Sequence, residues 1–296
     1  MSTSVTDALE RGAQVAGELA DVAERVRAFT VDVAAPGAGG TGSGVIWRAD
    51  GLIITNAHVA RAERMTVTMH DGRACDAAVV ARDDARDLAA LTVDAVGLEP
   101  AAVRDARTLR PGELVLAVGS PLGIRGAVAA GIVHAPSARG PGGRRWVRAD
   151  LRLAPGNSGG PLTDALGCVV GINSMIVAGL AMAIPSDVVQ RFVDGPMQPS
   201  LGIVARPVLV SLAGDPALGL LVLDVRPASV ASASGLATGD VLIAAGGHPF
   251  DSPNDLMGEL DEAGPDGVLP LTLLRGGRRM TLDARLRGGG SRVEAA

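Results

Sequence analysis

The feature that most constrains this chain is a glycine-rich stretch around one serine, Ala154-Pro155-Gly156-Asn157-Ser158-Gly159-Gly160-Pro161-Leu162. Glycines permit positive φ angles and close backbone approach, and successive N–H groups on such a loop can converge on one oxygen. An apolar run over residues 168–172 follows and predicts a strand. On this stretch alone two interpretations stay open: a nucleophile with its oxyanion hole, or a turn between two strands. A serine is a weak nucleophile, so the first interpretation requires a base elsewhere.

Length and composition indicate an ordinary globular protein of two domains. The chain has 296 residues, enough for two separate cores. Hydrophobic residues make up 47% but aromatic residues only 2%, so the cores must be built from small aliphatic side chains. The net charge is −5, from 27 basic and 32 acidic residues that are spread along the chain. This distribution argues against a nucleic-acid partner.

The cysteines and the terminal sequence bear on cofactors and location. Cys75 and Cys168 fit neither a metal pattern nor a disulfide framework, so we expect free core thiols, with one bridge as the alternative. No ATP-binding loop or metal-ligand cluster is present, and we expect no cofactor. Neither a secretory signal nor a membrane anchor is visible, and the apolar residues 169–185 predict two strands and a turn. We expect a cytoplasmic location if the chain is complete, and a periplasmic or other extracytoplasmic one if an N-terminal signal was removed.

The first two thirds of the chain predict a helix followed by β-structure. Apolar residues at near-helical spacing over 6–28 predict an amphipathic helix, so residues 1–28 are an N-terminal helical segment. A strand over 29–33 and a glycine-rich stretch follow. Short β-rich runs divided by turn signals then indicate an all-β sandwich or barrel over residues 29–194. These runs are residues 45–47, 52–55, 65–69, 77–80, 88–93 and 113–118.

The last third predicts a second, smaller α+β domain over residues 201–287. Prolines and small polar residues make residues 195–200 a linker. The expected elements are strands at 219–225, 241–245 and 268–274, a helix at 253–263 and a hairpin turn at 275–278. The glycine-rich residues 288–296 predict a disordered tail.

A histidine and an aspartate complete a catalytic constellation with Ser158. His58 follows the predicted strand at 52–55, and Asp87 precedes the one at 88–93. Each alone is more often structural, but together they occur in the order His, Asp, Ser, which is that of the chymotrypsin arrangement. We interpret the neighbouring Asp83 and Asp84 as a solvated pair.

Several motifs around these residues occur in one order along the chain. They are Gly42-Ser43-Gly44, Thr55-Asn56-Ala57-His58-Val59, Asp87-Leu88-Ala89-Ala90-Leu91, Ala117-Val118-Gly119-Ser120-Pro121-Leu122-Gly123, Ala130-Gly131-Ile132-Val133, Gly156-Asn157-Ser158-Gly159-Gly160-Pro161-Leu162 and Ala183-Ile184-Pro185. In these runs the chain resembles the HtrA (Deg) family of trypsin-like serine proteases. The resemblance implies a mainly β fold, a chymotrypsin-like double β-barrel with the active site between the barrels.

The resemblance extends into the second domain. Leu201-Gly202-Ile203 resembles the carboxylate-binding loop of a PDZ domain, and residues 227–231 and 235–242 resemble its next landmarks. The resemblance implies that the amides of Leu201, Gly202 and Ile203 bind the C-terminal carboxylate of a peptide. The peptide would add a strand, with Leu256 and Leu260 lining its apolar pocket. A scaffold domain whose groove is self-occupied is the alternative.

The expected mechanism is that of a serine protease. Ser158 would attack the peptide carbonyl, His58 would act as general base and then acid, and Asp87 would hold the imidazole. The oxyanion hole would be the loop Gly156, Asn157 and Ser158, through the amides of the first and last.

The specificity pocket is less clear from the sequence. Arg152, six residues before the nucleophile, Leu153 and Met182 are the candidate pocket residues. Family resemblance implies cleavage after small aliphatic residues, and a basic residue at 152 argues against cleavage after Lys or Arg. Ala154 stands where the family usually has Asn, which leaves the resting geometry of the loop open.

Three functions stay open at this point. The first is an ATP-independent serine endopeptidase of protein quality control and stress response, acting on unfolded or damaged proteins and regulated by peptides at its PDZ domain. The second is a non-proteolytic chaperone or adaptor with a latent triad, and the third a scavenger of C-terminal peptides. The intact triad favours the first. The family resemblance also implies a homotrimer, although Phe29 is the only aromatic residue near the expected interface.

Overall fold

The computed structural model describes residues 2–35, 41–140, 144–194, 200–212, 215–253, 255–264 and 266–286. They form two compact units, one of residues 1–138 and 146–193, the other of residues 139–145 and 194–296. The expected tail and all of the expected linker except residue 200 lie outside the described residues. The predicted domain boundaries stay predictions.

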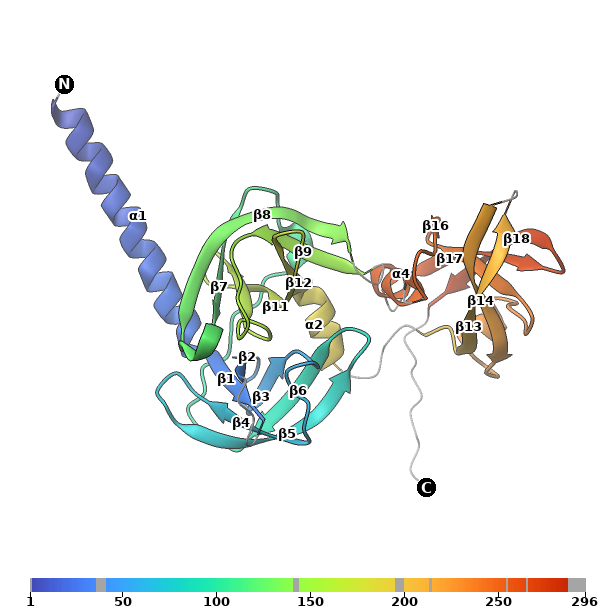
Figure 1. Cartoon of the computed structure of the whole chain (residues 1–296), viewed down its shortest axis with the longest axis horizontal. Coiled ribbons are helices and arrows are strands. Elements are labelled where there is room, and N and C mark those ends of the chain that lie inside the picture. The colour runs from blue at the N-terminus through green and yellow to red at the C-terminus, as the bar shows by residue number, and fades with distance from the viewer. Residues whose placement is uncertain are drawn as a thin grey trace. The chain divides into compact units, whose positions relative to one another are not determined.

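The first unit begins with a long helix, α1 (Ser2–Ala28), which contains the predicted segment. Its last turns are anchored by Val22, Ala23 and Val26, which are buried in a core cluster that includes residues of both barrels. In Figure 1 the helix projects away from the barrels toward the N-terminus. Accordingly, the described side chains between residues 10 and 18 are exposed. Among the described side chains, only those at the C-terminal end of the helix therefore pack against the barrels, although the amphipathic pattern extends along most of its length.

Two closed six-stranded barrels follow, which confirms the expected double-barrel fold (Figure 1). The first has the order β1-β2-β3-β6-β5-β4 and comprises β1 (Thr30–Ala34), β2 (Thr41–Ile46), β3 (Leu52–Thr55), β4 (Arg64–Thr68), β5 (Ala74–Asp83) and β6 (Leu88–Val93). The second has the order β10-β11-β12-β9-β8-β7 and comprises β7 (Leu114–Gly119), β8 (Ala127–Arg139), β9 (Arg145–Asp150), β10 (Pro161–Asp164), β11 (Val169–Val177) and β12 (Leu180–Pro185). Short helices η1 (Ala106–Thr108), η2 (Pro121–Gly123) and α2 (Ser186–Val193) connect or follow these strands.

Small aliphatic side chains fill the barrels, as the composition requires. Alternation along β4 buries Met65 and Val67, and β6 is buried along nearly its whole length because both of its faces are covered. Trp146 is the largest fully buried side chain. The apolar stretch at 169–185 forms the hairpin β11–β12 rather than a membrane span. Among the described residues, no helix is long and apolar enough to cross a bilayer.

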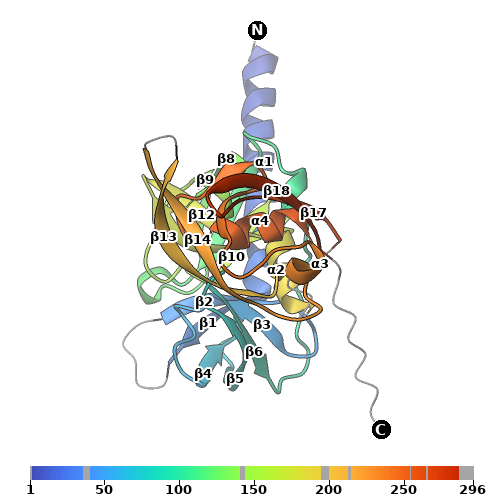
Figure 2. The same cartoon turned by 90° about the vertical axis from the view of Figure 1, so that its right-hand side faces the viewer.

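The second unit has its own core and a six-stranded sheet. Its elements are β13 (Ile203–Leu212), β14 (Asp215–Val225), α3 (Val230–Ala233), β15 (Val241–Ala245), β16 (His248–Pro249), α4 (Asp255–Ala263), β17 (Val268–Arg275) and β18 (Arg278–Arg285). The strand order is β13-β14-β15-β17-β18, with β16 paired to β15. Figure 2 shows β13, β14, β17 and β18 together with α3 and α4 of this unit. The predicted turn at 275–278 joins β17 to β18. Strand β13 forms one edge of this sheet, which leaves one side of its backbone without a strand partner in the described sheet.

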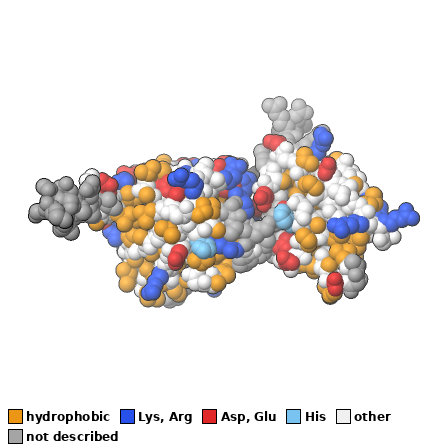
Figure 3. Space-filling model, turned by 90° about the horizontal axis from the view of Figure 1, so that it is seen from above, with side chains coloured by type: hydrophobic (Ala, Val, Ile, Leu, Met, Phe, Trp, Pro, Cys, Tyr) orange, Lys and Arg blue, Asp and Glu red, His pale blue; other side chains and the backbone are white. Residues whose placement is uncertain are grey.

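Acidic and basic side chains both occur over each unit on the face shown in Figure 3. Many charged side chains of the protein pair with a near neighbour in the sequence, as in Arg48–Asp50 and Arg73–Asp71. One sequence interpretation is wrong here. Asp83 is not solvated, because its carboxylate is only 10% exposed and accepts hydrogen bonds from the side chain and amide of Arg86.

Candidate functional site

The turns after β3 and before β6 bring His58 and Asp87 together. His58 Nδ1 lies 2.9 Å from both carboxylate oxygens of Asp87, and the His58 amide donates to Asp87 Oδ1 at 3.0 Å. The imidazole side chain is 43% exposed, whereas the carboxylate is 15% exposed. A carboxylate held in this way fixes the ring orientation and favours a proton on Nδ1, which leaves Nε2 to act as a base.

The environment of Asp87 keeps its carboxyl group ionised. Burial raises the pKa of Asp87, but hydrogen bonds from His58 and Ser174 together outweigh burial and lower it. Ser174 Oγ donates to Asp87 Oδ2 at 2.6 Å. Asn56 Nδ2 donates to the Asp87 carbonyl at 2.9 Å and supports a turn in which Asp87 has a φ of 57°. A non-glycine residue with positive φ is strained, and its presence at this position is typical of a functional site.

Ser158 belongs to the same hydrogen-bond network, through Ser174. Its Oγ donates to the backbone carbonyl of Ser174 at 3.0 Å, and among the described residues no hydrogen bond joins it to His58. Catalytic hydrogen bonds are often absent or long before substrate binds, so this geometry does not exclude nucleophilic attack. Rotation about the Cα–Cβ bond of Ser158 would free the hydroxyl from Ser174.

The loop before Ser158 presents two amides that could receive an oxyanion. The carbonyl of Pro155 accepts from the Leu122 amide at 3.0 Å, and the carbonyl of Gly156 accepts from Ser43 Oγ at 2.7 Å. Because C=O and N–H point in opposite directions across a trans peptide, the Gly156 amide faces away from Leu122. Within the described part of the chain, the amides of Gly156 and Ser158 have no protein acceptor.

Asn157 stabilises the conformation of this loop, because its hydrogen bonds go to the loop backbone and not into the oxyanion hole. Its amide donates to the Ala154 carbonyl at 3.0 Å and its side-chain Nδ2 donates to the same oxygen at 3.2 Å. The residue is 4% exposed. Gly156 has a φ of 108°, where a side chain would be strained and would collide with the Ser120 carbonyl. The loop conformation therefore depends on Gly156 and on the neighbouring residues 120–122.

The candidate pocket residues are dispersed. Arg152 is exposed, Leu153 is half-buried against the second barrel's core, and Met182 is 1% exposed within a core cluster. The buried position of Met182 leaves it only a supporting part in any pocket. Their assignment to substrate specificity stays a prediction.

The predicted carboxylate loop of the second unit is an ordered turn. The Leu201 carbonyl accepts from the Ala231 amide at 2.8 Å, and the Gly202 carbonyl accepts from the Arg226 amide at 2.9 Å. The Gly202 amide donates to Ser200 Oγ at 3.1 Å. One of the amides expected to bind the carboxylate is therefore already paired with a hydroxyl oxygen. Leu256 and Leu260 of α4 are 8% and 2% exposed and belong to the same core as Leu201.

Both cysteines are free, as expected. The expectation that they lie in the core is wrong, because each is only half-buried. Burial raises the pKa of the Cys168 thiol, with a further contribution from Asp164. The described residues contain no group of three His, Cys, Asp or Glu side chains placed to hold a metal ion.

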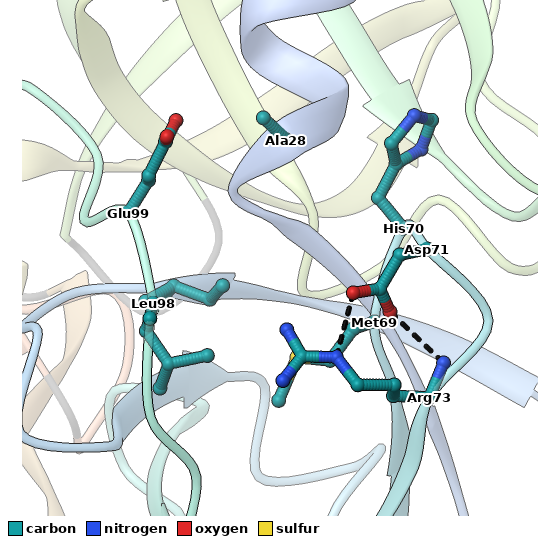
Figure 4. Close-up of a pocket in the computed structure, with 9 residues that line it drawn as sticks. Ala28, Met69, His70, Asp71, Arg73, Leu98 and Glu99 are labelled. Atoms are coloured by element: carbon teal, nitrogen blue, oxygen red, sulfur yellow. Dashed lines mark hydrogen bonds and ion pairs between the residues drawn. The ribbon is translucent and has the colours of Figure 1, made fainter.

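A separate hollow lies at the foot of α1 (Figure 4), and its lining contains none of the residues of the Ser158 network. Ala28, Met69 and Leu98 form apolar parts of its lining, while Asp71 turns toward Arg73, whose Nε donates to it at 2.6 Å. Asp71 and Arg73 neutralise one another, and Glu99 is a further acidic residue of the lining. Nothing in this lining resembles the chemistry at Ser158.

Sequence reasoning missed three residues of the site: Asn56, Ser43 and Ser174. Asn56 and Ser43 stand inside quoted motifs, so their neighbours His58 and Gly42 were a signal for them. Ser174 carries no such signal, since it lies in an apolar strand and reaches Asp87 only through the fold. Ser43 joins the two barrels, because its amide donates to the Ser158 carbonyl at 2.8 Å.

Two family models match the chain. A trypsin-like peptidase domain matches residues 42–172, and a PDZ domain matches residues 199–286. The match to the first includes all three residues of the predicted triad, and the match to the second covers nearly all of the second unit.

Curated relatives span the two domains together. A probable periplasmic serine endoprotease DegP-like from Halomonas elongata is 35% identical over 86% of this chain and 60% of its own length. The putative serine protease HhoA from Synechocystis is 34% identical over 82% of this chain and 69% of its own length. The chain thus spans less than two thirds of the Halomonas relative and slightly more than two thirds of the Synechocystis one.

A solved structure supports the same relationship. The HtrA-type protease AlgW, determined with a decapeptide, matches 91% of this chain and 98% of its own with a TM-score of 0.65 and 26% identity. The similarity covers both the double barrel and the domain that follows it.

Proposed function

This chain belongs to the HtrA (Deg) family of trypsin-like serine proteases, and we propose that it is a serine endopeptidase that cleaves unfolded or damaged proteins. The observation that carries the proposal is the connected network of His58, Asp87, Ser174 and Ser158 beside two amides that have no acceptor in the described part of the chain. The relatives' names support the hydrolytic reading over the chaperone and scavenger alternatives.

In the proposed reaction, Ser158 Oγ leaves the Ser174 carbonyl and attacks the substrate carbonyl carbon. His58 Nε2 takes the hydroxyl proton, and Asp87 stabilises the resulting imidazolium. The amides of Gly156 and Ser158 bind the tetrahedral oxyanion, each donor contributing about 3–4 kcal/mol. His58 then gives its proton to the leaving amine, and water repeats the sequence on the acyl-enzyme with His58 again as base.

The test combines covalent labelling with turnover. The wild-type chain is treated with a fluorophosphonate and assayed on unfolded casein, beside Ser158→Ala and the control Ser211→Ala, an exposed serine of β13. We expect Ser158→Ala to lose both labelling and cleavage and Ser211→Ala to keep both. A wild-type chain that neither labels nor cleaves contradicts the endopeptidase, and labelling of Ser158→Ala contradicts the nucleophile.

The PDZ domain is proposed to bind peptides through their free C-terminal carboxylate. The ordered turn at Leu201–Gly202 and the free edge of β13 support this, and AlgW was solved with a decapeptide. A carboxylate would replace Ser200 Oγ as acceptor of the Gly202 amide. Fluorescence anisotropy with an apolar peptide acid and its C-terminal amide separates carboxylate recognition from other binding, since only the acid should bind.

The oligomeric state and the cellular location are two further proposals. A homotrimer is our further proposal, since the family resemblance implies one; Phe29 is 7% exposed and packs in the core cluster shared by the two barrels, so it offers little to an interface. Light scattering after size exclusion measures the assembly. The name of the Halomonas relative supports an extracytoplasmic location, and fractionation of the native host measures it against the cytoplasmic alternative.

A further inference from the structure

The peptide group before Gly156 is held by a loop of the second barrel. Leu122, in η2, donates its amide to the Pro155 carbonyl at 3.0 Å. This bond sets the direction of the Gly156 amide, which is half of the proposed oxyanion hole. Reversal of that one peptide group would turn its carbonyl toward the hole and remove a donor. The geometry of residues 120–126 therefore matters for hydrolysis.

The loop does not hold this geometry by its own packing. Leu122 has a φ of 54°, a left-handed conformation that costs a leucine about 1 kcal/mol or more. Leu122 is 80% exposed and Ile124 is 64% exposed, so neither residue contributes much burial. A strained, poorly packed loop persists only if contacts elsewhere hold it.

Those contacts come from the end of α1 and from β1. The carboxylate of Asp32, in β1, accepts a hydrogen bond from Ser120 Oγ at one end of the loop and pairs with Arg125 Nε at 2.8 Å near the other. Arg27, in the last turn of α1, donates through Nε to the Gly126 carbonyl at 2.7 Å. The side chain of Asp32 is 15% exposed, whereas that of Arg125 is 60% exposed.

The central contact is the one to Ser120. Ser120 is 1% exposed, and its amide donates to Ser43 Oγ at 3.0 Å, while Ser43 Oγ donates to the Gly156 carbonyl. Asp32 thus reaches both peptide groups that flank Gly156: one through Ser120 and Ser43, the other through Leu122. The route through Leu122 ends at the peptide group that carries the Gly156 amide, and the route through Ser43 ends at the Gly156 carbonyl.

We propose that Asp32 is a positioning residue for hydrolysis, which fixes the loop 120–126 and through it the direction of the Gly156 amide. The inference rests on the proposed endopeptidase function. Asp32 touches no reacting atom. Loss of the Asp32 carboxylate lets the strained loop relax, so the oxyanion hole is formed in a smaller fraction of molecules. Binding of the transition state therefore weakens more than binding of the substrate.

The test uses the full chain and separates kcat from KM. Asp32→Ala should lower kcat at least about tenfold, a fraction of the loss expected for a whole donor, with KM changed less than about twofold. The rate of fluorophosphonate labelling should fall in parallel, because the phosphoryl oxygen uses the same hole. Asp32→Asn keeps an acceptor for Ser120 but not the charge, and it should recover most of the activity.

Two further variants control for folding. Asp50→Ala removes an aspartate that pairs with Arg48 at 3.0 Å on the same barrel but far along the chain from the loop, and it should leave kcat unchanged. Arg125→Ala removes an exposed partner of Asp32 and should lower kcat in the same direction even if Asp32→Ala does not fold. Wild-type kcat and labelling in both Asp32→Ala and Arg125→Ala overturn the inference. Inactivity of the wild-type chain overturns instead the function on which it rests.

Discussion

Ser174 donates its hydroxyl proton to Asp87 Oδ2 across 2.6 Å, while its backbone carbonyl accepts the hydroxyl proton of Ser158 at 3.0 Å. One residue of β11 therefore contacts both the proposed orienting carboxylate and the proposed nucleophile. The contact to Asp87 opposes the effect of burial and helps to keep that carboxylate ionised.

Ser174→Ala should raise the pKa of Asp87 and lower kcat by about tenfold, since a hydrogen bond to a charged group contributes about 1.5 kcal/mol. The backbone carbonyl remains, so Ser158 keeps its resting acceptor. The acid limb of the pH–kcat/KM profile, measured on a peptide substrate, should change from that of the wild type. An unchanged rate and profile would show that His58 alone orders Asp87.

Gly159→Ala should prevent formation of the active site. A Cβ at this position would lie 2.1 Å from the Ser43 carbonyl oxygen and 2.2 Å from Thr55 Oγ1, at a φ of 85°. We expect a loss of about 3 kcal/mol in the free energy of unfolding. Gly112→Ala is the matched control, with a φ of 86° and no atom near its Cβ, and should cost about 1 kcal/mol. Equal losses in urea unfolding would refute the steric argument.

Glu113→Gln should weaken the first unit at neutral pH more than in acid. Hydrogen bonds from Arg104 and Arg110 lower the pKa of Glu113 from 4.5 to about 2. The native state thus binds this proton at lower pH than the unfolded state. The stabilisation is complete above the unfolded pKa and is lost as the pH falls from about 4.5 to about 2.

The difference in unfolding free energy between wild type and Glu113→Gln should be about 1 kcal/mol at pH 7, because the pair is near the surface. It should shrink at pH 3. Urea titrations at both pH values measure it, with Glu99→Gln, an exposed glutamate, as the control. A difference that grows in acid contradicts the assigned pKa direction.

Arg275→Met should destabilise the second unit, though less than the loss of a fully buried pair would, because the Arg275 side chain is 40% exposed. Arg275 forms two hydrogen bonds of 2.7 Å to the carboxylate of Asp240, whose side chain is 2% exposed. Those bonds lower the pKa of Asp240 against the effect of burial. Hydrogen exchange of β15 should accelerate in Arg275→Met and not in Arg278→Met, whose arginine is exposed. Equal exchange in the two variants would show that the pair is dispensable.

The sequence by itself determined the residue types of the site and most strands. The predicted runs at 52–55, 88–93 and 241–245 coincide with β3, β6 and β15, because alternation and turn residues act between neighbours in the chain. His58, Asp87 and Ser158 were predicted from short motifs and from their order along the chain, and their catalytic roles stay predictions.

Only the tertiary structure decided which of these groups contact one another. It placed Ser174 on Asp87, directed Ser158 Oγ to a carbonyl rather than to His58, and exposed Arg152. It also joined Asp32 to Ser120, 88 positions away. Such contacts depend on how two closed barrels meet, and local propensity carries no information about a hydrogen bond between residues so far apart. The glycines around Ser158 marked where the site would be, and the packing of the barrels fixed its geometry.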